Sequence, residues 1–139
     1  VGLFSAFSFN CAFSEGVNGK ITISLESSEA TPIGGCKFFY TYNNSTGLNI
    51  TSLFHKVSFK EADGSIIDKH NLLSGRIKNG QDTDVIGQAP FIPCIEIKTV
   101  KLNNVFLIFV DGTSRRDLLD EIDDRIIVSS KISGINFIK

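Results

Sequence analysis

The 139-residue sequence has no tryptophan or methionine and contains only two histidines, three cysteines and three prolines. Such a supply of side chains is poor for a metalloenzyme, because clusters of histidine and cysteine are what bind zinc. Basic and acidic residues nearly balance, at 14 and 15, so no surplus of positive charge is available to attract nucleic acid. No apolar run approaches the roughly 20 residues of a membrane-spanning helix. We expect no cofactor, no metal ion, no nucleic-acid partner and no membrane span.

The residues that are present favour β-strands. Phenylalanine occurs 12 times and isoleucine is also frequent, and both residue types are enriched in strands. A chain of this length, with 42% hydrophobic residues, is sufficient for one domain with its own core. We therefore expect a single domain over residues 1–139.

Short segments that alternate apolar and polar residues recur along the chain. In residues 20–26, for example, Ile21, Ile23 and Leu25 share one face. Asp63-Gly64 and Asn79-Gly80 are typical of hairpin turns. The expected strands are residues 20–26, 36–42, 53–60, 65–68, 72–78, 95–99, 105–110, 125–129 and 131–138, with residues 81–93 forming a loop or an edge strand. Their number and spacing predict an antiparallel sandwich or barrel.

Two segments stand apart from this pattern. Residues 1–14 are consistent with the end of a secretory signal peptide or with a strand, and we favour the strand because its apolar residues alternate. Ser114 is placed to cap a short helix of about ten residues, in which Leu118, Leu119 and Ile122 share one side. The acidic residues 117–124 are then expected to form a solvated helix face.

The three cysteines do not form a metal-binding motif. Cys36 lies in an expected strand and Cys94 at the start of another, at a separation that resembles the inter-sheet disulfide of an immunoglobulin-like sandwich. The alternative is three reduced cysteines that pack as small hydrophobic side chains. We favour a Cys36–Cys94 disulfide over pairs that use Cys11.

The two histidines are expected to be structural. His55 shares the apolar face of its strand with Leu53 and Val57, which predicts a half-buried side chain. His70 is expected in a loop. No nucleophile, base and orienting group are suggested by the sequence, so we expect no catalytic residues and no enzyme activity.

The segment from Cys36 to Gly112 resembles small exported bacterial proteins with an immunoglobulin or fibronectin type III-like sandwich. The resemblance is carried by Phe39-Tyr40-Thr41-Tyr42-Asn43-Asn44, Val57-Ser58-Phe59 before Asp63-Gly64, Leu73-Ser74-Gly75, Asn79-Gly80-Gln81 and Pro93-Cys94-Ile95-Glu96-Ile97. It implies an all-β, antiparallel sandwich, here with one short helix, in a secreted or periplasmic binding protein without catalytic residues.

We therefore expect a non-enzymatic exported protein of a bacterium that recognises a protein partner, a host protein included, or that forms a homodimer. The candidate binding residues are Tyr40, Tyr42, Asn43 and Asn44, because tyrosine anchors beside adaptable asparagines suit recognition loops. Residues 81–93 and a strand edge at residues 7–13 are further candidates. The alternatives are a periplasmic accessory or structural protein and a small β-barrel ligand carrier.

Overall fold

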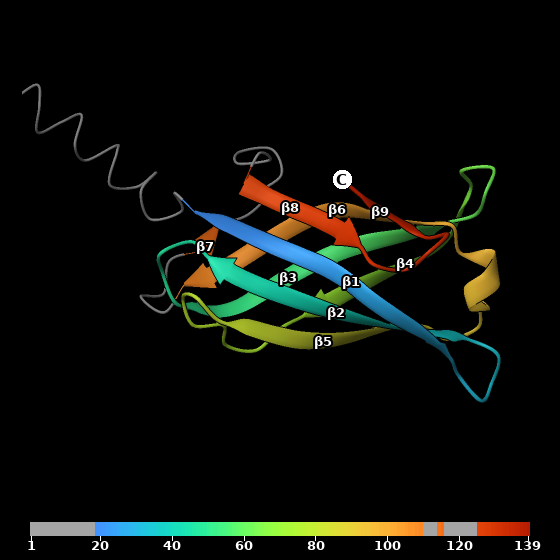
Figure 1. Cartoon of the computed structure of the whole chain (residues 1–139), viewed down its shortest axis with the longest axis horizontal. Coiled ribbons are helices and arrows are strands. Elements are labelled where there is room, and N and C mark those ends of the chain that lie inside the picture. The colour runs from blue at the N-terminus through green and yellow to red at the C-terminus, as the bar shows by residue number, and fades with distance from the viewer. Residues whose placement is uncertain (1–18, 110–113, 116–124) are drawn as a thin grey trace, which may run out of the picture.

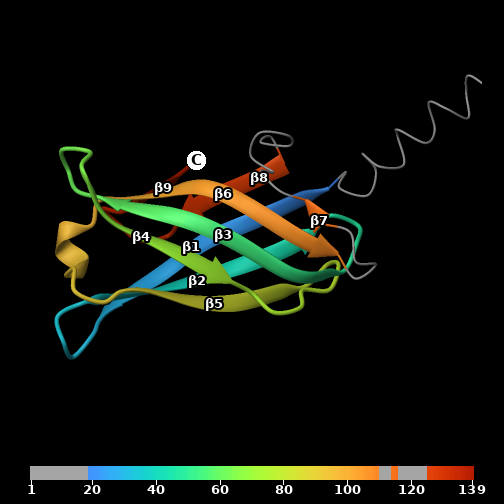
Figure 2. The ribbon, with the colours of Figure 1, turned by 180° about the vertical axis from the view of Figure 1, so that it is seen from behind.

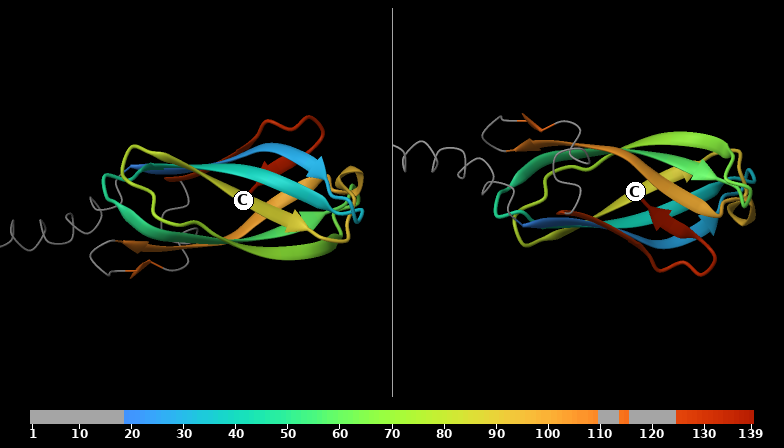
Figure 3. Two further views of the ribbon diagram at one scale, coloured as in Figure 1. Left: turned by 90° about the horizontal axis from the view of Figure 1, so that it is seen from below. Right: turned by 90° about the horizontal axis from the view of Figure 1, so that it is seen from above.

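The computed structural model describes residues 19–109, 114–115 and 125–139, which form two β-sheets packed face to face (Figure 1). The two layers are seen most clearly when the sheets are viewed edge-on (Figure 3). One sheet has the strand order β5–β2–β1–β8, and the other has the order β4–β3–β6–β7 with β9 also paired to β6. The strands are β1 (Lys20–Ala30), β2 (Cys36–Ser45), β3 (Ile50–Lys60), β4 (Ile66–Leu73), β5 (Asp82–Ala89), β6 (Thr99–Phe109), β7 (Ser114–Arg115), β8 (Ile126–Ser130) and β9 (Asn136–Ile138). The expected all-β sandwich is confirmed.

The sheets are mixed rather than purely antiparallel, which corrects the expectation. Strands β1, β2 and β5 pair antiparallel, as do β3, β4 and β6. By contrast β8 runs parallel to β1, and β9 runs parallel to β6. The reason is that residues 131–135 carry the chain from one sheet to the other, so β8 and β9 each pair with a strand to which no hairpin turn connects them.

The alternation in the sequence corresponds to burial in the structure. Along β2, Cys36, Phe38, Tyr40 and Tyr42 are buried, while the residues between them are partly exposed. The core lies between the two sheets, where Phe38 of one sheet stacks on Phe59 of the other with ring centroids 5.2 Å apart. The hydrophobic effect on these inward faces therefore holds the layers together.

Several expected elements have different bounds. Residues 94–96 form a short 3₁₀ helix, η1 (Cys94–Glu96), where a strand was expected, and β6 begins only at Thr99. Of residues 72–78, the first two belong to β4 and Ile77 alone bridges to Ile50. The edge-strand interpretation of residues 81–93 is confirmed by β5, which pairs with β2.

The N-terminal and helical predictions fall largely on residues that the structure does not describe. Residues 1–14, with Cys11 and the expected strand edge at 7–13, lie outside the described residues. So does most of the expected helix, residues 116–124. Its first residues, Ser114 and Arg115, are described and form strand β7, which pairs with β6.

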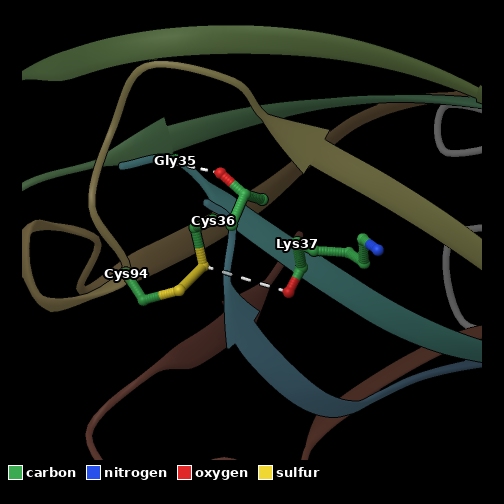
Figure 4. The surroundings of a disulfide bond; sticks show 5 residues. Gly35, Cys36, Lys37 and Cys94 are labelled. Atoms are coloured by element: carbon green, nitrogen blue, oxygen red, sulfur yellow. Dashed lines mark hydrogen bonds between the residues drawn. A yellow bond between two sulfur atoms is a disulfide. The ribbon is translucent and has the colours of Figure 1, made fainter. Parts of the chain in front are cut away.

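The expected disulfide between Cys36 and Cys94 is confirmed (Figure 4). Its Cα atoms lie 4.8 Å apart, and it joins the start of β2 to η1 in the connection between β5 and β6. Cys94 and the polar Glu96 would point to the same side of a strand, but both lie in a helical turn, so this shared parity did not determine the direction of the Cys94 side chain. Cys36 is fully buried at this end of the sandwich.

We expect the double variant Cys36→Ala/Cys94→Ala to lose about 4 kcal/mol of unfolding free energy. The disulfide closes a loop between residues 58 positions apart and so lowers the conformational entropy of the unfolded chain. Loss of the disulfide restores this entropy and favours unfolding. Urea denaturation measures the loss, and reductant should destabilise the wild-type protein but leave the variant unchanged. Thiol titration of the unreduced protein in denaturant should find one thiol per chain, that of Cys11. Three thiols would contradict the bond.

Candidate functional site

A polar pair lies in the centre of the core. The Tyr42 hydroxyl on β2 and Nδ1 of His55 on β3 share a hydrogen bond of 2.7 Å, and both residues are 0% exposed. Tyr40 contacts His55 edge-on, with ring centroids 5.6 Å apart. Within the described part of the chain, the Tyr40 hydroxyl and His55 Nε2 have no hydrogen-bond partner. His55 is thus a core residue as expected, although it is fully rather than half buried.

Burial determines the charge state of this pair. Desolvation lowers the pKa of His55 to about 3 and raises the pKa values of Tyr40 and Tyr42. All three side chains are therefore neutral near pH 7. A neutral histidine sealed from solvent is a structural group, because no substrate reaches it.

The four predicted binding residues do not form a surface. Tyr40, Tyr42 and Asn44 are buried, so neither tyrosine is available as an anchor for a partner. Only Asn43 is partly exposed, and its amide donates a hydrogen bond of 2.6 Å to Asp82 on β5. Asn43 and Asn44 also lie in a strand and not in a recognition loop, since β2 continues to Ser45. The inward parity of Tyr40 and Tyr42 was visible in the sequence and indicates core positions.

The Asn44 side chain forms hydrogen bonds to two segments that connect strands. Its amide nitrogen donates to the carbonyl oxygens of Leu48, at 2.7 Å, and Ile77, at 2.9 Å. Its amide oxygen accepts from the backbone N–H and the hydroxyl of Thr46, at 3.1 and 2.7 Å. Asn44 therefore links the β2–β3 turn to the segment between β4 and β5. Its role in this structure is to satisfy buried backbone groups.

His70 lies in β4 and not in a loop, which corrects the expectation. It is half-buried, and its ring meets Phe59 edge-on with centroids 4.8 Å apart. Desolvation lowers the pKa of His70, and the negative charge of Asp68 opposes that shift. His70 therefore adds to the neutral, aromatic character of the core.

The most exposed large apolar side chains lie on two loops at one end of the sandwich. Ile33, in the β1–β2 turn, is 70% exposed, and Phe91 and Ile95, in the β5–β6 connection, are 82% and 79% exposed. We call Ile33, Phe91 and Ile95 the apolar tip. Both loops lie at the same end in opposite views of the molecule (Figures 1 and 2). The sequence alone does not reveal this feature, because apolar residues beside prolines resemble core positions.

The loops that carry the apolar tip are held rigidly. The disulfide fastens η1 to the start of β2, immediately after the β1–β2 turn. Gly35 packs so closely on Ala89 and Pro90 that a Cβ there would clash with their carbonyl oxygens. Within the turn, the Thr31 hydroxyl accepts a hydrogen bond of 2.9 Å from the Gly35 N–H. The exposed side chains therefore project from loops that a disulfide, a close backbone packing contact and a hydrogen bond tie to the sandwich.

The described residues offer little for other kinds of site. Among them, no group of three or more His, Cys, Asp and Glu side chains is placed to hold a metal ion. No helix in the described ranges is long and apolar enough to cross a membrane.

Comparison with known proteins supports the fold. No protein-family model and no curated protein sequence matches the chain. Among solved structures, IrmA from Escherichia coli is similar with a TM-score of 0.60 and 11% identity, over 81% of this chain and 91% of IrmA. A GH20 exo-β-N-acetylglucosaminidase from Vibrio harveyi aligns with a TM-score of 0.43 and 14% identity, over 84% of this chain but 18% of the enzyme. The similarity to IrmA establishes a shared sandwich fold.

We expect Asn44→Ala to lower the unfolding free energy by about 3 kcal/mol, because four hydrogen bonds to buried or partly buried groups are lost. Asn43→Ala is the matched control in the same strand and should change stability by less than about 0.5 kcal/mol. Urea denaturation measures both. Equal stability of the two variants would contradict the structural role of Asn44.

Folding stability should fall by about 2 kcal/mol between pH 7 and pH 5 because of His55. The unfolded chain protonates this histidine near pH 6.5, whereas the folded protein keeps it neutral down to about pH 3. Acid therefore favours the unfolded state throughout that window, and His70, whose pKa is also lowered, acts in the same direction.

Denaturation at several pH values tests this effect. The variant His55→Gln should lose most of the pH dependence between pH 7 and pH 5, whereas His70→Gln should keep the larger part. An unchanged slope in His55→Gln would show that other groups are responsible.

Proposed function

We propose that the protein is an exported, non-enzymatic binding protein that recognises another protein through the apolar tip. The exposure of Ile33, Phe91 and Ile95 carries this proposal. Exposed groups of large apolar side chains on soluble domains are typical of interaction sites, and aromatic side chains often dominate binding energy. The partner is expected to present an apolar depression that takes up Phe91.

The rigidity of the two loops supports recognition. Binding is weakened when loops must be ordered, and a backbone already fixed by a disulfide and a packed glycine loses little entropy. The loops of a stable sandwich commonly carry function for this reason.

The disulfide supports export. Such bonds persist in oxidising compartments, including the bacterial periplasm and the extracellular space, and are rare in the cytosol. A secreted or periplasmic bacterial protein therefore remains the proposed setting.

The contents of the core argue against the alternatives of an enzyme and a ligand carrier. Phe38, Tyr40, Tyr42 and Phe59 fill the space between the sheets, which a carrier would keep open. The Tyr42–His55 pair is sealed inside. A purely structural accessory protein would gain nothing from solvent-exposed Phe91.

Binding through the edge of β5 has less support. This strand pairs only with β2, so one edge is unpaired within the described sheets. It also carries Asp82 and Asp84, and charged side chains discourage a second strand from adding to an edge.

The proposal predicts that Phe91→Ser weakens partner binding without loss of stability. The wild-type protein, immobilised, would capture its partner from bacterial envelope or host extracts, and the purified partner would then be titrated against each variant. Loss of an aromatic anchor should raise the dissociation constant by about tenfold or more. Leu73→Ser is the matched control, since Leu73 is 64% exposed and pairs with Phe54 within β3, away from the two loops of the apolar tip.

Two results would overturn this proposal. Equal affinity of wild type and Phe91→Ser would exclude the apolar tip as the binding surface. A homodimer that dissociates in Phe91→Ser, measured by light scattering, would show that a second copy of the chain covers the tip instead.

A further inference from the structure

The outer face of the β4–β3–β6 sheet is basic. Strand pairing across this sheet places Asn71, Lys56 and Asn104 in one row and Lys69, Ser58 and Lys101 in the next. A third row contains Ile66, Lys60 and Thr99. This sheet lies toward the viewer in Figure 2.

The four lysines of this face form no salt bridge within the described ranges, and no residue of the three rows is acidic. Asp68, the acidic residue nearest to Lys69 in β4, has the opposite parity and pairs with the buried Phe59. A protein with a net charge of −1 thus gathers four of its 14 basic residues on one sheet face. Such a concentration of charge attracts anions.

A concavity of about 520 Å³ lies in this face. Its lining includes Lys56, Ser58, Ile66, Lys69, Asn71 and Asn103. A β-bulge contributes to it: Lys56 pairs with Asn104 and Val57 with Leu102, so Asn103 is an extra residue in β6. Bulges are frequent beside functional sites because they redirect a side chain.

The bulge directs Asn103 toward Ser58. The Asn103 amide nitrogen donates a hydrogen bond of 2.6 Å to the Ser58 hydroxyl oxygen. Ser58 is only 1% exposed although its parity faces outward, so neighbouring side chains enclose it. The hydroxyl hydrogen of Ser58 and the amide oxygen of Asn103 remain able to take part in further hydrogen bonds.

The lining groups define the chemistry of a ligand. The ammonium groups of Lys56 and Lys69 only donate hydrogen bonds and carry positive charge, which suits a carboxylate or sulfate. The amides of Asn71 and Asn103, both exposed in the concavity, donate and accept hydrogen bonds, which suits hydroxyl groups. Ile66, 52% exposed, provides an apolar wall for the C–H face of a ring.

We propose that this concavity binds an acidic saccharide unit, a sugar ring that carries one carboxylate or sulfate. Its volume falls in the range of small-molecule sites. A flat acidic protein surface would contact the lysines but would not reach the Asn103 amide, which lines the concavity beside the buried Ser58. The site lies on a sheet face and not on the loops of the apolar tip, so it goes beyond the proposed function and does not depend on it.

The test uses the ¹⁵N-labelled full chain and follows backbone amide resonances while glucuronate is added. Glucuronate should shift the resonances of Lys56, Ser58, Lys69, Asn71 and Asn103 in a saturable manner. Glucose has the same ring and hydroxyl groups without the carboxylate and should bind at least about tenfold more weakly, as expected when a charge-assisted interaction is absent. Inorganic phosphate provides charge without the sugar ring.

The double variant Lys56→Gln/Lys69→Gln should weaken glucuronate binding by about tenfold or more while the spectrum stays folded. Lys37→Gln is the matched control, because Lys37 lies on the outer face of the other sheet, and it should bind glucuronate as the wild type does. Unchanged glucuronate binding by the double variant, with weakened binding by Lys37→Gln, would overturn the proposal.

Three other results would also overturn it. Glucuronate shifts that never saturate would indicate bulk charge attraction only. Phosphate binding as tight as glucuronate binding would show that the sugar ring is not recognised. Shifts with an acidic peptide but not with glucuronate would assign the face to a protein partner instead.

Discussion

One buried hydrogen bond, between the Tyr42 hydroxyl and Nδ1 of His55, connects the two sheets within a mostly apolar core. Burial of unpaired polar groups is costly, so each of these side chains needs the other. If β2 or β3 slipped by one residue, the polar side chain of that strand would move to the outer face and the other would be left buried without its partner. The pair therefore fixes the relative position of the layers, which stacking of Phe38 on Phe59 alone would specify less strictly.

The alternation of apolar and polar residues predicted the strands that have one buried face. It failed where an inward residue is glycine, and where a helical turn has an alternating sequence. Strand β5 has no clear pattern because Gly87, one of its inward residues, leaves its space to Leu72 and Tyr40. Residues 95–97 alternate in sequence, yet Ile95 and Glu96 follow Pro93 in a 3₁₀ turn and do not form a strand. The parallel pairing of β8 with β1 and of β9 with β6 joins residues distant in sequence, so no local sequence pattern could predict it.

The exposed surfaces were harder to predict than the fold. The sequence indicated the correct cysteine pair, but three of the residues expected at a surface are buried, and Asn44 bonds with Ile77, 33 positions away. Phenylalanine is usually buried, and Phe91 is exposed only because of the path that its loop follows. The lysines of the β4–β3–β6 face come from three strands, so their grouping follows from strand register and not from their spacing along the chain.

The parallel strands have a consequence for folding. Ile21 pairs with Ile126, and Val100 with Phe137, so the β1 and β6 edges stay open until residues 126–138 arrive. Closing such long loops is slow, because their entropy is lost before the contacts form. An intermediate with two open edges is prone to pair with other chains. A high protein concentration during refolding should therefore favour aggregation over the native sandwich.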